Sequence, residues 1–196
     1  MICSVISHYD QLIDEGNDPV HDAPSLQAYM NQWDGPEFIE QMQLDILYVI
    51  PAGIPPHKQI DAGDDPMHRY RMCELAFWDV EKVFVSDVEI KRAGKSYTVD
   101  TLRQLYDPAN RLFFLMGTDM LLTLDHWREP EEIFRLCYPV YIRREADAEL
   151  DATIIEKITS YRERFGKTVP RIVAPAIELS SSRVREAVAA GESIDD

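Results

Sequence analysis

Long apolar runs are absent from this sequence. No stretch approaches the ~18 consecutive apolar residues that a membrane-spanning helix needs. The opening Met-Ile-Cys-Ser-Val-Ile-Ser also lacks the basic start and long apolar core of a signal peptide. We therefore expect no membrane association and a cytoplasmic location.

Cysteine is scarce as well. The three cysteines, Cys3, Cys73 and Cys137, are odd in number, far apart and not spaced as zinc ligands are. This pattern argues against a disulfide framework and against a structural zinc site. It predicts buried, reduced thiols.

Positive charge is in deficit, with 20 Lys and Arg against 35 Asp and Glu, a net charge of −15. A surface this acidic repels phosphate backbones and anionic lipid, so nucleic acid and membranes are not expected partners. An anionic substrate must then bind at a local cationic spot. Each base that stands beside a polar motif is more informative for that reason.

The first 45 residues show no glycine-rich turn of the kind that opens many nucleotide sites. Asp14–Asp22 is polar and turn-rich, and the helical pattern of Ser25–Met42 is interrupted by Asp34-Gly35-Pro36. Met1–Ile6 is a weak candidate strand. We therefore predict an atypical N-terminal segment over residues 1–43 and one domain over residues 44–196.

Strands and helices alternate from residue 44 onward. The pattern predicts strands over 46–51, 83–90, 111–116, 140–142 and 171–179, and helices over 66–80, 98–106, 119–124, 130–136, 151–165 and 182–190. Strands separated by helices of this length pair in parallel through right-handed crossovers. The expected fold is α/β, a mostly parallel sheet flanked by helices.

Polar groups stand where several of these strands end, the edge at which such sheets bind ligands. A proline-stiffened loop, Pro51–Lys58, presents His57 and Lys58 to one phosphate at a reduced entropy cost, although a structural turn with a solvated lysine fits equally well. Gly117 lets a ligand approach the backbone, and Asp119 can accept from ribose hydroxyls or simply complement a helix dipole.

Two further groups begin helices. Ser96 or Thr98 can cap the helix that starts there, and the same free amides suit a carboxylate. Ser180 to Ser182 and Arg185 begin the last predicted helix and can meet a polyphosphate from one side, or form a capped helix with a solvated arginine. Trp127 is a stacking platform or a core residue. Arg143 follows another strand end and can add positive charge there, or stay solvated.

The order of these motifs and their residues resemble those of the bacterial nicotinate-mononucleotide adenylyltransferases. The resemblance begins at Leu44 and covers about three quarters of the chain, through the strings LDILYVIPAGIPPHK, KRAGKSYTVDTL, LFFLMGTDM, the Trp127 segment, VYIRR and IELSSSRVRE. It implies a Rossmann-like nucleotidyltransferase fold. It also implies that ATP and nicotinate mononucleotide are joined, pyrophosphate is released, and Mg²⁺ is held by the ATP phosphates.

The resemblance also implies roles for particular residues. The Tyr97-Thr98 backbone would hold the nicotinate carboxylate and Trp127 would stack on its ring. The remaining roles are substrate phosphate for His57 and Lys58, the ribose region for Gly117 and Asp119, the mononucleotide phosphate for Arg143, and the ATP phosphates for Ser180, Ser181, Ser182 and Arg185.

The head of the chain departs from that family, which begins with a strand, a glycine-rich turn and His-x-Gly-His. Here Asp18-Pro-Val-His21 is followed by Asp22-Ala-Pro24, and no His-x-Gly-His occurs. Residues 7–45 are instead similar to the leader of a class of S-adenosylmethionine-dependent methyltransferases. We therefore expect the family's first strand and His-x-Gly-His turn to be absent or replaced, and the domain to end before the family's C-terminal tail.

Three hypotheses stay open. The chain is an adenylyltransferase with reduced activity, a non-catalytic nucleotide-binding protein, or a methyltransferase; the missing Glu-x-Gly-x-Gly argues strongly against the third. The oligomeric state, a homo-oligomer among the options, is not fixed by the sequence.

Overall fold

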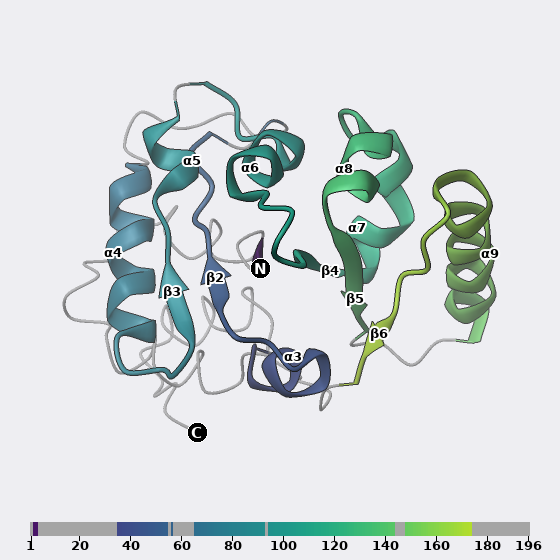
Figure 1. Cartoon of the computed structure of the whole chain (residues 1–196), viewed down its shortest axis with the longest axis horizontal. Helices are drawn as coiled ribbons and strands as arrows, with labels where there is room; N and C mark the ends of the chain where they lie inside the picture. The colour runs from purple at the N-terminus through teal and green to yellow at the C-terminus, as the bar shows by residue number, and fades with distance from the viewer. Residues whose placement is uncertain are drawn as a thin grey trace, which may run out of the picture.

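Six parallel strands form one sheet in the computed structural model, which describes residues 2–3, 35–54, 56, 65–92, 94–143 and 148–173 (Figure 1). Their order across the sheet is β3-β2-β1-β4-β5-β6. The strands are β1 (Ile2–Cys3), β2 (Leu47–Val49), β3 (Val83–Val85), β4 (Phe113–Gly117), β5 (Tyr138–Ile142) and β6 (Arg171–Ile172). The predicted α/β fold with a parallel sheet is confirmed.

The short strand β1 occupies the centre of the sheet. Ile2 pairs with Tyr48 of β2 on one side and with Phe114 of β4 on the other. The weak strand expected over Met1–Ile6 is thus present in part. Because the chain leaves β1 toward β2 and β3 and then returns to β4, the strand order reverses between β1 and β4. Ligands bind outside the carboxyl ends of the strands at such a point.

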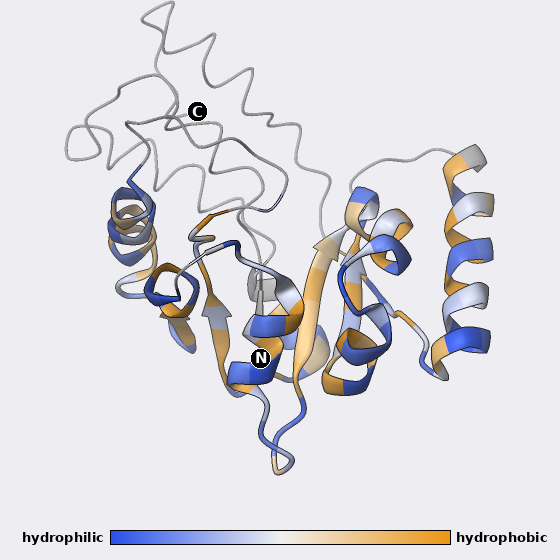
Figure 2. Ribbon diagram, turned by 90° about the horizontal axis from the view of Figure 1, so that it is seen from above, coloured by the Kyte–Doolittle hydropathy of each residue, from blue (hydrophilic) through white to orange (hydrophobic). Residues whose placement is uncertain are grey.

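Helices cover both faces of the sheet. The helices α3 (Gly35–Met42) and α4 (Pro66–Phe77) supply one core cluster, and α6 (Thr98–Leu105), α7 (Thr118–Thr123), α8 (Pro130–Leu136) and α9 (Ala148–Phe165) supply the other. Neighbouring residues of β4 divide between the faces: Leu115 joins the first cluster, whereas Phe114 and Met116 join the second. Figure 2 accordingly shows mostly hydrophobic strands between helices that carry both hydrophobic and hydrophilic residues.

The helix α3 belongs to the same core as the strands. Its Phe38 is fully buried in the cluster that contains Leu47 and Val140. The side-chain amide of Gln41 donates to the carbonyl of Val173 over 2.6 Å and accepts from the amide of Val173 over 3.0 Å, which ties α3 to the end of β6. Packing is therefore continuous across the boundary predicted at residue 44.

The helix predicted from Pro66 is confirmed. It begins with Asp65, whose carboxylate accepts from the amide of Met67 over 2.8 Å, followed by proline in the first turn. The helices predicted from residues 98, 119, 130 and 151 are confirmed with shifts of a few residues at their ends. The strand predicted over 140–142 is longer, because β5 begins at Tyr138.

The helix α3 begins at Gly35-Pro36, where proline is well tolerated in a first turn; the earlier part of the pattern over Ser25–Met42 lies outside the described residues. One prediction about local structure was wrong. The strand predicted over 83–90 ends at Val85, and a short helix, α5 (Val88–Lys91), follows. The alternation of residues 86–90 resembles that of a strand, but Glu89 belongs to α5 and its carboxylate accepts a hydrogen bond from Thr101. The predicted helix over 182–190 and the rest of the strand predicted over 171–179 lie outside the described residues.

The described thiols behave as expected. Cys73 and Cys137 are buried and free of disulfide bonds. Burial raises the pKa of Cys137 to about 12, so this thiol stays protonated and unreactive. None of the described helices combines the length and apolar character needed to cross a bilayer.

Candidate functional site

The described site residues gather at the carboxyl edge of the sheet. Gly117 ends β4 and Arg143 directly follows β5. The hydroxyl of Thr118 donates to the carbonyl of Ile142 over 3.4 Å, which joins the ends of these two strands. The loop after β2 and the start of α6 lie on the β1 side of the same edge.

The loop after β2 is held by a buried arginine that the sequence did not single out. Arg69 of α4 is fully buried, and its guanidinium donates to the carbonyls of Ala52 over 2.7 Å and Gly53 over 3.0 Å. A fully buried arginine in a helix is unusual, since arginine is rarely buried without partners. Because these two partners are backbone carbonyls, no side-chain pattern in the sequence predicts them.

Ser96 ties this loop to the segment that precedes α6. Its hydroxyl oxygen accepts from the amides of Gly53 over 3.0 Å and Ile54 over 3.3 Å, while its own amide donates to the carbonyl of Ile54 over 2.7 Å. The predicted capping role of Ser96 or Thr98 was therefore wrong. The N-cap of α6 is Tyr97, which forms no side-chain capping bond.

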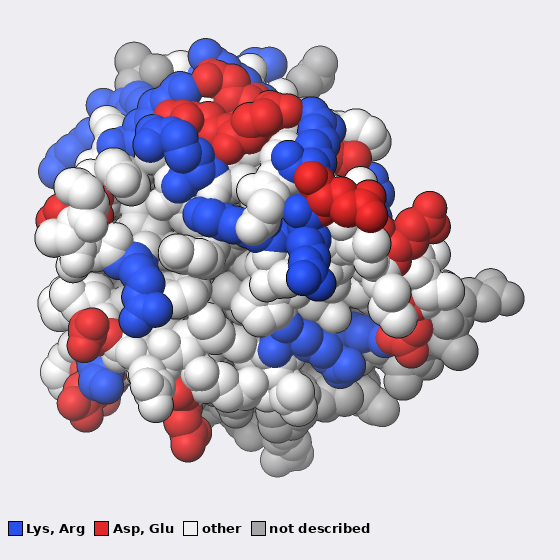
Figure 3. All heavy atoms as spheres, turned by 45° about the vertical axis from the view of Figure 1, so that its right-hand side comes forward, with Lys and Arg blue, Asp and Glu red and all other residues white. Residues whose placement is uncertain are grey.

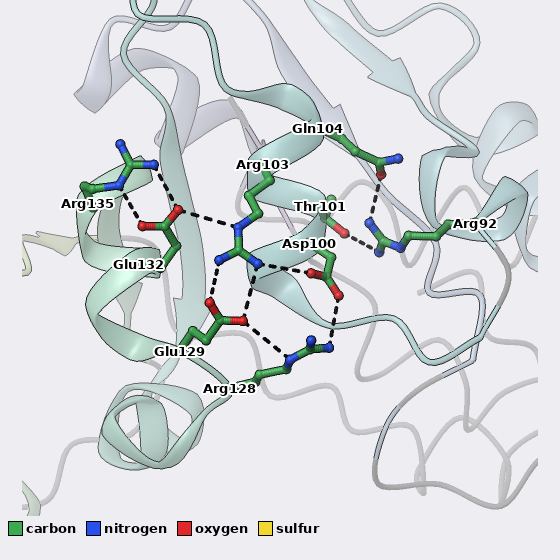
Figure 4. A network of polar contacts seen from close by, with 9 residues as sticks. All are labelled: Arg92, Asp100, Thr101, Arg103, Gln104, Arg128, Glu129, Glu132 and Arg135. Atoms are coloured by element: carbon green, nitrogen blue, oxygen red, sulfur yellow. Dashed lines mark hydrogen bonds and ion pairs between the residues drawn. The ribbon is translucent and has the colours of Figure 1, made fainter.

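A buried carboxylate lies behind Ser96. The hydroxyl of Thr101 donates to Glu89 over 2.5 Å, and Ser96 forms a second hydrogen bond to the same carboxylate. Burial raises the pKa of Glu89, although these two hydrogen bonds and the charge of Arg92 act in the opposite direction. Figure 4 shows Arg92 reaching Thr101 and Gln104 from the other side. The cluster fixes α5 against α6.

Gly53 and Gly117 differ in what surrounds them. A Cβ atom on Gly53 would lie 2.5 Å from the carbonyl oxygen of Glu89, so glycine is required there by packing. A Cβ atom on Gly117 would meet nothing within 4 Å in the described part of the chain. Among the described residues, the space in front of Gly117 is open, and the approach of a ligand to its backbone stays a prediction. Asp119 is exposed in the first turn of α7.

Trp127 is half-buried next to β4. Its ring meets Phe114 edge-on, with centroids 6.0 Å apart and planes inclined by 66°. Its indole nitrogen donates to the hydroxyl of Thr123 over 3.4 Å, which is long for a hydrogen bond. The two readings of Trp127 are thus compatible, because the ring packs on the core and yet the residue is only half-buried.

Two arginines flank this site in different ways. The guanidinium of Arg128 lies 4.7 Å from the ring centre of Tyr97, a cation–π contact, and pairs with Asp100 over 3.3 Å. Arg143 is buried and forms an ion pair with Asp151, whose side chain is half-exposed. Its charge is therefore already partnered in this state of the protein.

The remaining predicted phosphate-binding residues lie outside the described residues. These are His57, Lys58, Ser180, Ser181, Ser182 and Arg185. The described part of the chain contains no group of three or more His, Cys, Asp or Glu side chains arranged to hold a metal ion. On the face drawn in Figure 3, basic and acidic side chains lie next to one another, so no broad field of one sign covers it.

Comparison with known proteins identifies the relatives of this chain. A model of the cytidylyltransferase-like family matches residues 37–187. A curated protein of Clostridium botulinum (strain Kyoto / Type A2), named "Probable nicotinate-nucleotide adenylyltransferase", is 35% identical over 180 residues, covering 90% of this chain and 85% of the relative. A protein of the same name from Geotalea uraniireducens is 36% identical over 173 residues, covering 81% and 80%.

Solved structures support the same fold. The nicotinic acid mononucleotide adenylyltransferase of Plasmodium falciparum complexed with APC matches with a TM-score of 0.56 and 19% identity, covering 82% of this chain and 77% of that one. The same enzyme complexed with NaAD matches with a TM-score of 0.54, covering 81% of both chains.

Proposed function

The chain belongs to the nicotinate-nucleotide adenylyltransferases of the cytidylyltransferase-like family, and on that premise we propose that it transfers the adenylyl group of ATP to nicotinate mononucleotide. The products are nicotinate adenine dinucleotide and pyrophosphate, a step of NAD biosynthesis. The reaction is a transferase reaction with two phosphorylated substrates.

The reaction requires little covalent chemistry from the protein itself. An oxygen of the mononucleotide phosphate attacks the α-phosphorus of ATP, the bond to the bridging oxygen of the β-phosphate breaks, and pyrophosphate leaves. Catalysis of such a transfer consists of alignment and charge stabilisation. ATP enters as its magnesium complex, with phosphate oxygens as the principal metal ligands.

One observation carries the proposal. Gly117 at the end of β4 faces open space in the described part of the chain, and Trp127 packs on Phe114 of the same strand. Arg128, the residue after Trp127, lies over Tyr97 at the start of α6. The strand order reverses between β1 and β4. A parallel sheet binds nucleotides at this point. An aromatic face and free helix amides suit a planar ring that carries a carboxylate.

The resemblance of the sequence to this family supports roles for the described residues. We assign the Tyr97-Thr98 backbone to the nicotinate carboxylate, Trp127 to its ring, and Gly117 with Asp119 to the ribose region. Arg143 can reach the mononucleotide phosphate once that phosphate takes over from Asp151 as its partner. Because Asp151 is half-exposed, the exchange leaves no buried, unpaired carboxylate behind.

The phosphates of ATP require donors beyond these. We assign His57 and Lys58 to substrate phosphate, and Ser180, Ser181, Ser182 and Arg185 to the ATP phosphates. The support is the sequence itself, which places hydroxyl groups and bases directly after predicted strands. Reaction in the cytoplasm and a homo-oligomeric state stay predictions.

The similarity to curated relatives extends into the N-terminal segment. An alignment that covers 90% of the chain must include part of residues 1–43, which the adenylyltransferase relatives therefore share. The similarity of this segment to a methyltransferase leader stays a prediction, as does its separation from residues 44–196.

A second candidate is a nucleotide-binding protein without turnover. The missing His-x-Gly-His favours it, because the loss of one preorganised donor to developing charge costs ~2.7–4 kcal/mol in the transition state. The two candidates differ in turnover and not in binding.

The test is an assay of pyrophosphate release with ATP and nicotinate mononucleotide. We expect turnover that is reduced ~10- to 100-fold by Trp127→Ala, in keeping with the loss of ~1–3 kcal/mol of ring stacking. Pyrophosphate released at a rate unaffected by Trp127→Ala would contradict the assigned site. Saturable binding of both substrates without any release would establish the second candidate instead.

A further inference from the structure

The segment between η1 (Leu124–His126) and α8 is fastened to α6 by a set of charged contacts, which we call the Arg128 cluster (Tyr97, Asp100, Arg103, Arg128 and Glu129). Arg128 lies over the Tyr97 ring at 4.7 Å and pairs with Asp100 over 3.3 Å and with Glu129 over 3.6 Å. Arg103 pairs with Asp100 over 3.4 Å and with Glu129 over 2.5 Å. Figure 4 shows Asp100 and Arg103 of α6 converging with Arg128 and Glu129, which precede α8.

The backbone at this junction is strained. Glu129 adopts the left-handed conformation, with φ 53° and ψ 59°, immediately before the proline that starts α8. For a residue with a side chain this conformation costs roughly 1–2 kcal/mol. Arg103 holds both carboxylate oxygens of Glu129, at 3.3 and 2.5 Å, and so stabilises the strained turn. The direction in which the chain passes Trp127 is therefore set by contacts with α6.

We propose that Arg128 is a positioning residue that holds Trp127 in register with the Tyr97-Thr98 amides. Ring stacking and carboxylate binding then act on one nicotinate group at the same time. The proposal rests on the proposed function for the identity of this ligand. It assigns to Arg128 no contact with the substrate.

The packing of Trp127 explains why a further constraint is needed. Its described ring and polar contacts are one ring edge against Phe114 of β4 and a long hydrogen bond to Thr123 of α7. It also packs against the core cluster that includes Val99 and Leu102 of α6, a non-directional contact that does not fix the orientation of the ring relative to the Tyr97-Thr98 amides. Arg128 is the next residue along the chain and touches both the Tyr97 ring and the first turn of α6, so it couples the two halves of the nicotinate site.

The cost of losing Arg128 should appear in substrate binding and not in folding. Its side chain is 49% exposed, and exposed ion pairs contribute ~0–1 kcal/mol to stability. A misplacement of about 1 Å in a binding group, by contrast, can reduce catalysis ~100-fold. A merely structural role would produce the reverse pattern.

The chain supplies a matched control. Arg135 pairs with Glu132 over 2.6 Å and lies over the ring of Tyr106 at 5.5 Å, so it combines an ion pair with a cation–π contact as Arg128 does. It joins α8 to the opposite end of α6, away from Trp127. Glu132 also pairs with Arg103 over 3.5 Å, so Arg135→Ala borders the Arg128 cluster, but it removes the same kinds of contact while every contact of Arg128 itself stays in place.

The first experiment compares steady-state constants of Arg128→Ala and Arg135→Ala. We expect Arg128→Ala to raise KM for nicotinate mononucleotide about tenfold while KM for ATP changes less than about twofold, and Arg135→Ala to change neither. Arg128→Lys should recover only part of the affinity, because an ammonium keeps the charge but lacks the planar fork. In a Trp127→Ala background the effect of Arg128→Ala should disappear, since the two residues act through one ring. Equal effects of Arg128→Ala in both backgrounds, or equal effects on both substrates, would overturn the proposal.

A second readout does not depend on turnover. In a Trp33→Phe/Trp78→Phe background Trp127 is the only tryptophan of the chain's three. We expect Arg128→Ala to lower its fluorescence anisotropy and Arg135→Ala to leave it unchanged. Unchanged anisotropy with Arg128→Ala would refute the positioning role even in a protein that catalyses nothing. Lowered anisotropy in a protein that neither binds nor converts nicotinate mononucleotide would instead refute only the proposed function.

Discussion

Buried polar residues, more than the exposed bases, determine how the described part of the site is built. Arg69 holds the loop after β2 through two carbonyls, and Ser96 holds the same loop through two amides. Glu89 in turn anchors Ser96 and Thr101. A buried polar network of this kind is costly when incomplete, so each member makes a distinct prediction.

The pH dependence of stability should reveal Glu89. Its pKa is raised from an ordinary value of 4.5, chiefly by burial. As pH rises through the window between 4.5 and the raised pKa, the unfolded chain releases a proton that the folded protein retains, so the free energy of unfolding falls. Glu89→Gln has no proton to release. Its free energy of unfolding, relative to that of the wild type, should therefore rise across this window by ~1.4 kcal/mol for each unit of pKa shift. Urea unfolding at a series of pH values measures this difference.

Asp125 provides a control of opposite sign. Burial raises its pKa, but the hydrogen bonds and charge of Lys157 outweigh this and leave the pKa lowered. Its contribution to stability is present above the unfolded pKa and is lost as pH falls. The free energy of unfolding of Asp125→Asn, relative to that of the wild type, should therefore fall as pH rises. The same trend for both variants would contradict the assignment of the Glu89 shift.

Substitution of Gly53 should affect folding, whereas substitution of Gly117 should affect substrate binding. Gly53→Ala forces a Cβ against the Glu89 carbonyl at 2.5 Å and should destabilise the protein by ~1–3 kcal/mol. Gly117→Ala meets open space in the described part of the chain and should change stability by less than ~0.5 kcal/mol, while it weakens substrate binding. Thermal unfolding and substrate titration measure the two effects. A stable Gly53→Ala protein, or a Gly117→Ala protein with normal affinity, would each contradict this division.

At the scale of elements, periodicity predicted most helices because their apolar faces repeat every three to four residues. It failed at residues 86–90, where Glu89 turns inward to a polar partner that no hydrophobic pattern encodes. It also failed to predict the use of Ser96, whose hydrogen bonds join segments far apart in the sequence. Local pattern predicts elements, whereas non-local polar contacts decide how site loops are held.

The short strand β1 is the element on which the sheet most depends. Cys3 pairs with Val49 on one side and with Leu115 on the other, so proline at this position removes a donor from an interior strand. We expect Cys3→Pro to lower the free energy of unfolding by at least ~1–3 kcal/mol, whereas Cys3→Val, a good strand former, should be tolerated. Equal stability of the two variants in urea unfolding would show that β1 does not join the halves of the sheet.

At the scale of the whole molecule, a net charge of −15 must accommodate two anionic substrates. On the proposed assignment, the described residues would do so with groups that carry little free charge: helix amides, an aromatic ring, a glycine and an arginine that is already paired. Binding at this edge of the sheet stays a prediction from the sequence, which could not predict that Arg143 is buried and paired with Asp151. That pairing depends on how α9 packs after β5.

The most direct test of adenylyl transfer follows each phosphorus atom. The protein is incubated with nicotinate mononucleotide and ATP labelled with ³²P at either the α or the γ position, and the products are separated. The account predicts that the α label enters nicotinate adenine dinucleotide and that the γ label leaves as pyrophosphate, in equal amounts. An α label that never enters the dinucleotide, in a protein that binds both substrates, would contradict it.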